Sequence, residues 1–268
     1  MTTIGHPDAL VVAGGGAKAF AALGAVHVLK KAGKLDRLKA VAGTSAGAIV
    51  AAGVALGRPP LDMCKAFVRE RYVPKYDIKK FGEKFGLDSG EHLDRWIKVV
   101  LDGEHTFESI KRDTGIDLIV CATDLNDRKA RYFDPSSTPT VDVATALRMS
   151  CAIPLYFTAV SFEGRVYVDG ALCDNFPYEV VATREGVEAP LGLAYAYEGQ
   201  TGPVENFEQY VTAIINCATE KQHVRERANV LTLDCGDTKL FDFKNPRVLR
   251  KLFKSGVLQT SVWMKKNE

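Results

Sequence analysis

Short apolar runs alternate with longer helical segments in the first part of the chain. Residues 8–13 (DALVVA) form an apolar run ended by three glycines, which predicts a buried strand. The Ala- and Leu-rich segment 18–31 ends in two lysines and is followed by Gly33, which predicts a helix with a C-terminal stop. Residues 38–43 predict a second strand, and residues 45–56 predict a second helix. This order is typical of a parallel sheet covered by helices on both faces.

The following stretch, 58–115, is more polar, and we expect it to lie over the sheet rather than within it. Its predicted helices are near 61–70, 91–101 and 106–113. Later strand-like runs are 116–123, 129–133, 157–160, 165–168, 191–196 and 230–234. Later helices are predicted at 141–150, after Pro177, at 205–227 and at 246–264. No repeat or linker interrupts the pattern, so we expect a single domain over 1–268, with a core at about 8–185 and flanking strands and helices in 186–268.

Composition agrees with a folded domain of ordinary type. Apolar residues make up 46% and charged residues 25% of the 268, and the net charge of +2 gives no overall attraction for nucleic acid. The uncharged run 40–57 approaches the length of a membrane span, but it is rich in Gly and Ala and interrupted by GTSAG. A strand, a turn and a buried helix explain it better. No secretory signal is expected at the N-terminus, which lacks a basic segment before an apolar one.

The six cysteines lie far apart, without a CxxC pair or a histidine at metal-ligand spacing. They are Cys64, Cys121, Cys151, Cys173, Cys217 and Cys235. Cys121, Cys151 and Cys217 fall in apolar segments, where a buried thiol behaves as a small hydrophobic group. We therefore expect free thiols in a reducing, cytoplasmic setting, with no metal and no cofactor.

The first candidate for chemistry is the segment Gly43-Thr44-Ser45-Ala46-Gly47, which fits G-x-S-x-G between a predicted strand and a predicted helix. A serine at such an elbow occupies a strained turn, and the glycines prevent clashes between strand and helix. The following helix directs its positive end toward the serine oxygen. Alone, the segment fits a small-residue turn as well. The strand and helix on either side favour Ser45 as a nucleophile, supported by Gly43 and Gly47.

A glycine loop, Gly14-Gly15-Gly16-Ala17-Lys18, precedes the first helix. Its backbone N–H groups could stabilise an oxyanion, because glycines let the backbone approach a substrate closely. A dinucleotide fingerprint fits only in part, since no acidic residue ends the second strand, and the loop does not continue as GxxxxGK[ST]. A turn without a ligand stays open as an alternative. The neighbouring serine elbow favours the oxyanion interpretation.

A serine nucleophile needs a proton acceptor. None of the five histidines lies in a recognisable motif; they are His6, His27, His92, His105 and His223. Asp169 ends the strand-like run 165–168 and is followed by Gly170-Ala171. A carboxylate with such small neighbours can approach a second loop closely, although turn chemistry alone would favour a simple Asx turn at this position.

Three motifs in fixed order resemble the patatin-like phospholipase family. They are Gly14-Gly15-Gly16-Ala17-Lys18, Gly43-Thr44-Ser45-Ala46-Gly47 and Asp169-Gly170-Ala171. The segments ATDLND (122–127), ALRMSCAIP (146–154) and DGALCDNFP (169–177) are similar to the family too, so the resemblance covers roughly residues 8–185. It implies a three-layer α/β/α sandwich around a mainly parallel sheet. Residues 186–268 match no pattern.

The resemblance also implies a serine hydrolase of the phospholipase A type that works through an acyl-enzyme and cleaves fatty-acyl esters of phospholipids or related lipids. Ser45 would be the nucleophile, Asp169 the base, and the backbone of Gly14, Gly15 and Gly16 the oxyanion hole. The supporting motif residues would be Lys18, Gly43, Gly47, Gly170 and Ala171. Such a dyad requires Asp169 to be buried and within hydrogen-bond reach of Ser45, because a free aspartate is a poor base.

Several alternatives stay open at this point. One is an acyltransferase or a non-lipid esterase whose triad is completed by a histidine such as His223. Another is a lipid-binding protein without turnover, which only Ala19 favours, since the family usually has glycine there. Alanine is harmless at this position if the backbone is helical, and strained if φ is positive.

Two segments are candidates for membrane contact. The basic and apolar tail 247–254, with Trp263 and two lysines beyond it, could lie on an anionic membrane, but packing on the domain is favoured. Tyr72, Val73, Phe81 and Phe85 are a second candidate, as a lid over an acyl channel. The expected partner is an acyl-lipid substrate, with peripheral membrane contact and no nucleic acid.

Overall fold

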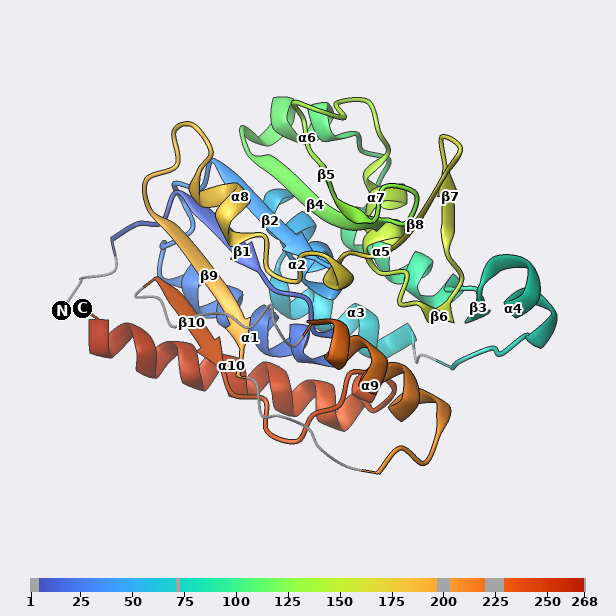
Figure 1. Cartoon of the computed structure of the whole chain (residues 1–268). Helices are drawn as coiled ribbons and strands as arrows, with labels where there is room; N and C mark the ends of the chain where they lie inside the picture. The colour runs from blue at the N-terminus through green and yellow to red at the C-terminus, as the bar shows by residue number, and fades with distance from the viewer. Residues whose placement is uncertain (1–4, 71–72, 197–202, 220–228, 268) are drawn as a thin grey trace.

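The computed structural model describes residues 5–70, 73–196, 203–219 and 229–267. Its centre is an eight-stranded sheet in the order β10-β9-β1-β2-β4-β8-β7, with β5 also paired to β4 (Figure 1). Neighbours from β10 to β4 are parallel, whereas β5, β7 and β8 pair antiparallel. The strands are β1 (Ala9–Val12), β2 (Ala40–Thr44), β4 (Asp117–Asp124), β5 (Lys129–Phe133), β7 (Val160–Phe162), β8 (Arg165–Asp169), β9 (Pro190–Tyr195) and β10 (Val230–Leu233).

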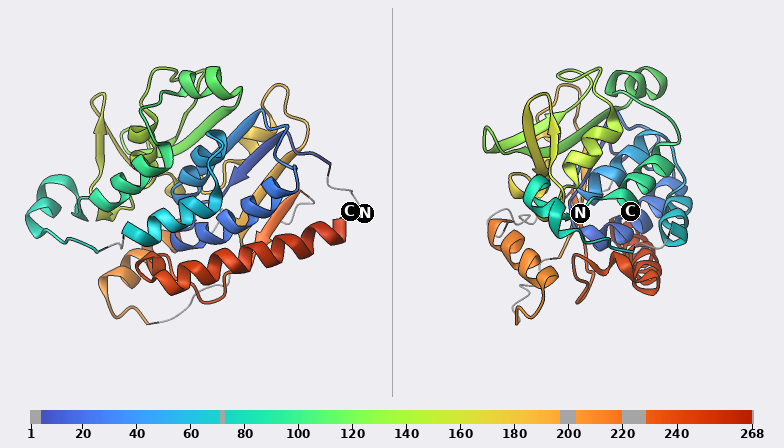
Figure 2. Two further views of the ribbon diagram at one scale, coloured as in Figure 1. Left: turned by 180° about the vertical axis from the view of Figure 1, so that it is seen from behind. Right: turned by 90° about the vertical axis from the view of Figure 1, so that its right-hand side faces the viewer.

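Helices cover the two faces of the sheet unequally (Figures 1 and 2). The thicker layer contains α1 (Ala19–Lys31), α2 (Ala46–Ala55), α3 (Pro60–Glu70), α5 (Glu91–Leu101), α7 (Val143–Ser150) and α10 (Pro246–Asn267). On β1, Leu10 and Val12 belong to the core on this side, and Ala9 and Val11 face α8 (Tyr178–Ala182) on the other. Side chains of a strand alternate between faces, so an uninterrupted apolar strand is buried on both. The three-layer α/β prediction is confirmed.

Helix α6 (Phe107–Thr114) also belongs to the thicker layer, because it lies against β4 and its buried Phe107 and Ile110 are part of the same core. The remaining elements are α4 (Ile78–Lys84), β3 (Gly86–Asp88), β6 (Leu155–Phe157) and α9 (Phe207–Thr219), with short 3-10 turns η1 (Gly16–Lys18), η2 (Gly170–Leu172) and η4 (Asp242–Lys244). Strands β3 and β6 form a separate two-stranded sheet. No described residue of 58–115 belongs to the central sheet, as predicted.

Two details of the predicted elements were wrong. The strand expected at 157–160 is divided into β6, which ends at Phe157 and pairs with β3, and β7, which begins at Val160 and pairs with β8. Helix α4 and strand β3 were not predicted, since their segment alternates lysines, glycines and aromatic residues without a clear period. The helix expected at 205–227 is α9, which ends at Thr219; residues 220–228 lie outside the described part.

Helix α10 packs along α1 at close range, as Figure 2 shows. Leu249, Leu252 and Phe253 are buried in this contact. A methyl group at Gly256 would collide with the backbone oxygen of Ala21. The prediction that the tail packs on the domain is therefore confirmed.

The uncharged run 40–57 forms β2 and α2, which are almost fully buried. Within the described residues, no helix combines the length and apolar character needed to cross a bilayer.

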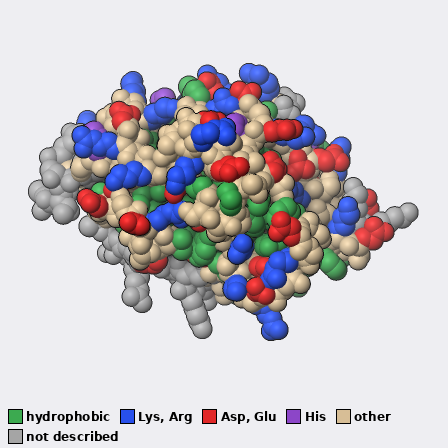
Figure 3. Space-filling view, turned by 90° about the horizontal axis from the view of Figure 1, so that it is seen from above, with side chains coloured by type: hydrophobic (Ala, Val, Ile, Leu, Met, Phe, Trp, Pro, Cys, Tyr) green, Lys and Arg blue, Asp and Glu red, His purple; other side chains and the backbone are tan. Residues whose placement is uncertain are grey.

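All six cysteines have free thiols, but Cys217 is exposed on α9, so the expectation of a buried thiol there was wrong. In the face shown in Figure 3, Lys and Arg side chains are interspersed with Asp and Glu, and apolar side chains gather between them near the middle.

Candidate active site

The serine elbow joins β2 to α2. Ser45 has φ 54° and ψ −132°, a backbone conformation that non-glycine residues rarely adopt. Such a conformation costs of order 1–3 kcal/mol and persists only where the surroundings enforce it. A side chain at Gly43 would collide with the backbone of Gly47, and one at Gly47 with the backbone at the end of β1. The two glycines therefore let strand, elbow and helix lie in contact.

A second serine holds the elbow in place. The backbone N–H of Ser45 donates to the Oγ of Ser150 at 2.8 Å, and this hydroxyl donates to the carbonyl of Cys121 at 2.5 Å. Ser150 is fully buried at the end of α7. It links the elbow to β4, a role that its place in ALRMSCAIP did not reveal, because hydrogen bonds to backbone groups leave no periodic signal in the sequence.

Strand register brings Asp169 level with Ser45. Thr44, just before the elbow, pairs with Cys121 of β4, and Asp169 at the end of β8 pairs with the next residue, Ala122. Ser45 and Asp169 therefore flank β4 at the same height. Two strand spacings, about 10 Å, separate their backbones. Side chains that lean over β4 from both sides can meet across that gap.

The two side chains form a direct hydrogen bond. Ser45 Oγ donates to Asp169 Oδ2 at 2.6 Å, and the other carboxylate oxygen accepts from the backbone N–H of Ala171 at 2.9 Å. Asp169 is only 3% exposed and Ser45 only 6%. Burial raises the pKa of Asp169 to about 6, against the lowering effect of these two hydrogen bonds. The predicted burial and contact are confirmed.

The glycine loop corrects one expectation. The N–H of Gly14 donates to the carbonyl of Asn175 at 3.0 Å, so this amide is not available to an oxyanion. The N–H groups of Gly15 and Gly16, in contrast, have no hydrogen-bond partner within the described chain. The candidate oxyanion hole is thereby reduced to Gly15 and Gly16. A backbone amide that is already paired cannot donate equally well to a substrate.

The segment that follows Asp169 holds both loops. Asn175 accepts from the N–H of Gly14 through its carbonyl, and its side-chain amide donates to the carbonyl of Gly14 at 3.2 Å. Thr44 Oγ1 donates to the carbonyl of Asp174 at 2.9 Å. A methyl at Gly170 would collide with the carbonyl of Cys121. Asp169, the elbow and the glycine loop are thus parts of one hydrogen-bonded unit.

Ala19, the departure from the family pattern, begins α1 with φ −57° and ψ −21°, so alanine is not strained there. Ala19 therefore no longer favours the alternative of a lipid-binding protein without turnover. Lys18 precedes it in η1 and lines the cavity beside the dyad.

No histidine lines the cavities at Ser45 within the described residues; His223 lies outside them. Cys151 does line one of these cavities, but burial raises the pKa of its thiol well above the ordinary value. It therefore stays protonated and is a weak nucleophile. Among the described residues, no group of three or more His, Cys, Asp or Glu side chains is arranged to hold a metal ion.

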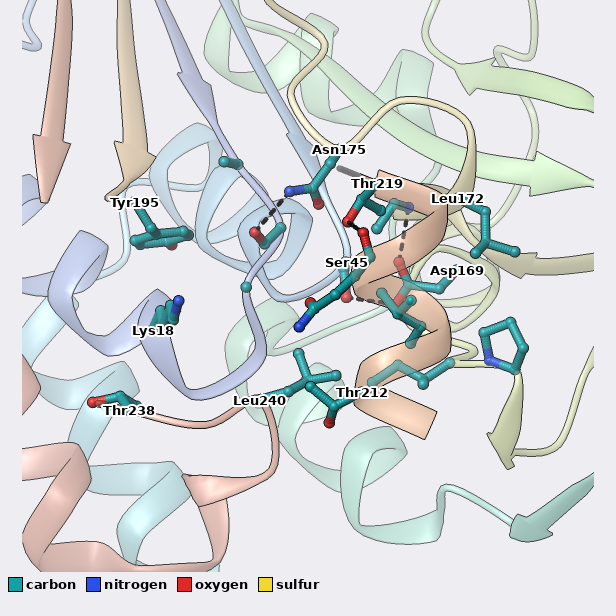
Figure 4. Close-up of a pocket in the computed structure, with 18 of the residues that line it drawn as sticks. Lys18, Ser45, Asp169, Leu172, Asn175, Tyr195, Thr212, Thr219, Thr238 and Leu240 are labelled. Atoms are coloured by element: carbon teal, nitrogen blue, oxygen red, sulfur yellow. Dashed lines mark hydrogen bonds between the residues drawn. The ribbon is translucent and has the colours of Figure 1, made fainter. Parts of the chain in front are cut away.

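Two cavities meet at Ser45. The large cavity, of about 330 Å³, also contains Asp169 and is shown in Figure 4. Its polar lining is Lys18, Asn175, Tyr195, Thr212, Asn216, Thr219, Thr232 and Thr238, beside Gly14 and Gly15. The apolar cavity, of about 50 Å³, is lined by Gly16, Phe20, Ala46, Ile49, Phe67, Leu93, Trp96, Cys151, Ile153, Phe157 and Phe243. Phe20, Phe67 and Trp96 form one aromatic cluster, with ring centroids 4.7–6.0 Å apart.

The described residues of the expected lid do not line these cavities. Val73 and Phe85 are 59% and 61% exposed, Phe81 is 37% exposed, and none of the three lines either cavity. Tyr72 lies outside the described residues. One wall of the large cavity is instead α9, from the segment for which the sequence offered no pattern.

Comparisons with known proteins agree with this fold. VipD from Legionella pneumophila has a crystal structure that covers 99% of this chain with a TM-score of 0.64 and 16% identity, over 68% of its own length. YqhO of Bacillus subtilis, an uncharacterised protein, is 29% identical over 269 aligned residues, which cover 87% of this chain and 89% of YqhO. Protein 463L of Invertebrate iridescent virus 6, named a probable lipid hydrolase, is 25% identical over 64% of this chain and 62% of its own.

The sequence model of one family matches more than half of the chain, over residues 10–182. This range begins in β1, spans the glycine loop, the serine elbow and Asp169, and ends with α8. The match and the relatives support a lipid hydrolase. The chain therefore belongs to the patatin-like phospholipase family.

Proposed function

We propose that this protein is a serine lipid acyl hydrolase of the phospholipase A type that uses Ser45 and Asp169 as a catalytic dyad. The observation that carries the proposal is the 2.6 Å hydrogen bond from Ser45 Oγ to a buried carboxylate. The strained elbow supports the same assignment, because backbone strain of this kind concentrates at functional sites.

In the first half-reaction, Ser45 Oγ forms a bond to the carbonyl carbon of the ester while its proton moves to Asp169 Oδ2. The carbonyl oxygen becomes an oxyanion, which the N–H groups of Gly15 and Gly16 would stabilise. The tetrahedral intermediate collapses, the bond to the alcohol oxygen breaks, and Asp169 returns the proton to that oxygen. The products of this step are a free alcohol and an acyl group on Ser45.

In the second half-reaction, water attacks the acyl carbon and gives a proton to Asp169. The bond between Ser45 and the acyl group breaks, Asp169 returns its proton to Ser45 Oγ, and a fatty acid leaves. Burial assists both steps, because a pKa of about 6 makes Asp169 a stronger base than an exposed aspartate while leaving it mostly ionised at neutral pH.

The test compares Ser45→Ala and Asp169→Asn with the wild type on a fluorogenic phospholipid and on a short-chain ester. We expect both variants to lose at least about 10³-fold in kcat. Ser161→Ala and Asp36→Asn, at exposed positions, are the matched controls and should retain activity. In parallel, mass spectrometry after treatment with a fluorophosphonate should place the adduct on Ser45.

The outcomes separate the alternatives. Hydrolysis of the short ester but not of the lipid would indicate a non-lipid esterase. Transfer of the acyl group to an added alcohol faster than to water would indicate an acyltransferase. Full activity in Asp169→Asn would show that another base completes the site, and binding of lipid without turnover in the wild type would remove the enzyme assignment.

A further inference from the structure

The two cavities at Ser45 differ in chemistry, and this difference gives the bound ester a direction. Within the described residues, only Ser45 and Ile153 line both cavities. The apolar cavity contains no charge, and apart from the Ser45 hydroxyl, the Cys151 thiol and the Trp96 indole N–H, which donates to the carbonyl of Met63, it is lined by hydrocarbon side chains and glycine. A hydrocarbon chain binds favourably there, because the apolar surfaces of both the chain and the cavity wall are removed from water. If the acyl chain occupies this cavity, the alcohol part of the ester lies in the large one.

The large cavity contains a cation that has no counterion among the described residues. Lys18 is half-buried beside the glycine loop, and its ammonium group makes no ion pair or hydrogen bond within the described part of the chain. The carboxylate in the same cavity, Asp169, already accepts from Ser45 and Ala171. A partly desolvated ammonium group is favoured by a nearby anion. The cavity therefore has room for a negative charge near Lys18.

A second, independent group points to the same ligand. The hydroxyl of Tyr195 is buried and has no hydrogen-bond partner in the described chain. Leaving a buried donor without a partner is costly, so native structures seldom do so without a reason. Burial raises the pKa of Tyr195 well above its ordinary value, which keeps the hydroxyl protonated as a donor.

These groups lie together at one end of the large cavity. Figure 4 shows Lys18 beside Tyr195, with Thr238 below them, on the side of the glycine loop that faces away from Asp169. A Cβ at Gly15 would be only 2.6 Å from the ring of Tyr195, so the loop and the tyrosine are in contact. Charged and hydroxyl donors thus continue directly from the candidate oxyanion hole.

We propose that Lys18 and Tyr195 form a subsite for a phosphoryl group on the alcohol side of the substrate. The proposal rests on the proposed function for its orientation and narrows it: the preferred substrates are acyl esters of phosphate-bearing alcohols, with the acyl chain in the apolar cavity. A phosphoryl group offers several acceptor oxygens to such donors, whereas the hydroxyls of a neutral glyceride offer no charge to Lys18.

The first experiment compares 1-dodecanoyl-glycerol 3-phosphate with 1-dodecanoyl-glycerol, which differ only in the phosphate. We expect the wild type to favour the phosphate ester, and Lys18→Met to lower the ratio of the two kcat/KM values about 10- to 100-fold. Tyr195→Phe should lower the ratio by a smaller factor, about 3- to 10-fold. Lys31→Met, at the exposed end of α1, removes the same charge and should leave the ratio unchanged. Equal losses on both substrates, or no loss, would overturn the subsite.

The second experiment separates this proposal from the proposed function, because it needs no turnover. In the Ser45→Ala protein, calorimetry should detect tighter binding of the phosphate ester than of the glyceride, and Lys18→Met should remove the difference. Inorganic phosphate should compete with the phosphate ester, which would show that free phosphate binds at the same subsite. If the wild type hydrolyses both esters while neither the phosphate ester nor inorganic phosphate shows Lys18-dependent binding, the hydrolase assignment stands and the phosphoryl subsite is wrong.

Discussion

The charge of Asp169 sets the conditions under which the site works. Its carboxylate is buried and, within the described part of the chain, accepts two hydrogen bonds, from Ser45 and Ala171. Burial outweighs them and holds the pKa at about 6. A profile with a midpoint near 6.5 therefore does not identify a histidine here, although an unperturbed aspartate would titrate far lower. The assignment of the base has to come from variants.

Activity should depend on the ionised form of Asp169. We expect kcat/KM on a soluble short-chain ester to be level above pH 7 and to fall about tenfold per pH unit below pH 6, because the protonated carboxyl cannot accept the proton of Ser45. Initial rates from pH 4.5 to 8.5 test this. A midpoint near pH 4 would contradict a desolvated base.

The same buried charge should destabilise the fold at neutral pH. The folded pKa lies above the unfolded value near 3.9, so the contribution of Asp169 is most favourable below pH 4 and is lost as the pH rises through 6. Asp169→Asn should therefore raise the free energy of unfolding by up to about 3 kcal/mol at pH 7.5. The gain should shrink toward pH 4.5. Urea titrations at both pH values measure it, and a destabilised variant at pH 7.5 would refute this account.

At the scale of residues, the sequence predicted the two reacting side chains but not the hydrogen bonds that position them. Ser45 and Asp169 were predicted because their motifs are short and ordered along the chain. The hydrogen bond from the Ser45 backbone to Ser150 and the one from Gly14 to Asn175 were not predicted. The partner of a backbone amide depends on how the folded strands and loops are aligned, and any nearby hydroxyl or carbonyl can accept the bond. Gly14 was consequently assigned to the oxyanion hole together with its two neighbours.

At the scale of elements, helices α1 and α10 are in direct backbone contact. Gly24 and Gly256 let the two helices touch through their backbones, since a methyl at either position would meet the opposite helix. Most strands and helices were predicted within a few residues, because apolar periodicity and glycine or proline boundaries mark them clearly. Elements β3, β6 and α4 were missed or misplaced, because they are short and partly exposed and their pattern carries little signal.

A bulky residue in this contact should separate the helices. Gly256→Val would place two methyl groups against the backbone of Ala21, and we expect the free energy of unfolding to fall by about 2 kcal/mol. Leu258→Ala, on the exposed side of α10, is the matched control and should change it little, since Leu258 is 66% exposed. Chemical denaturation of both variants gives the comparison. Equal stabilities would mean that α10 does not pack as described.

For the whole molecule, the important feature is that distant parts of the chain complete the cavities. The large cavity takes walls from β9, β10 and α9, all outside the range that matches the family. Their residues could not be predicted as part of the site, because the sequence there has no motif and the walls form only when the C-terminal strands join the sheet. The apolar cavity likewise takes Phe67, Leu93 and Trp96 from the polar middle of the chain.

The apolar cavity should set the preferred acyl length. Leu93 is half-buried in its wall, and Leu93→Trp should fill part of its 50 Å³. We expect kcat/KM for a p-nitrophenyl octanoate to fall about tenfold relative to the butanoate. Leu93→Met keeps the volume and should preserve the wild-type ratio. If Leu93→Trp keeps the wild-type ratio too, the acyl chain lies elsewhere.

The position of Ser45 between two unlike cavities has a consequence for the fate of the acyl group. Once the first product has departed from the large cavity, the intermediate stays anchored by its hydrocarbon tail while the opposite side is vacated. Whatever enters the vacated space first, a water molecule or another hydroxyl compound, becomes the acceptor. Hydrolysis and transesterification would then differ only in the occupancy of one compartment, and mutations in its walls could shift the balance between them without touching the dyad.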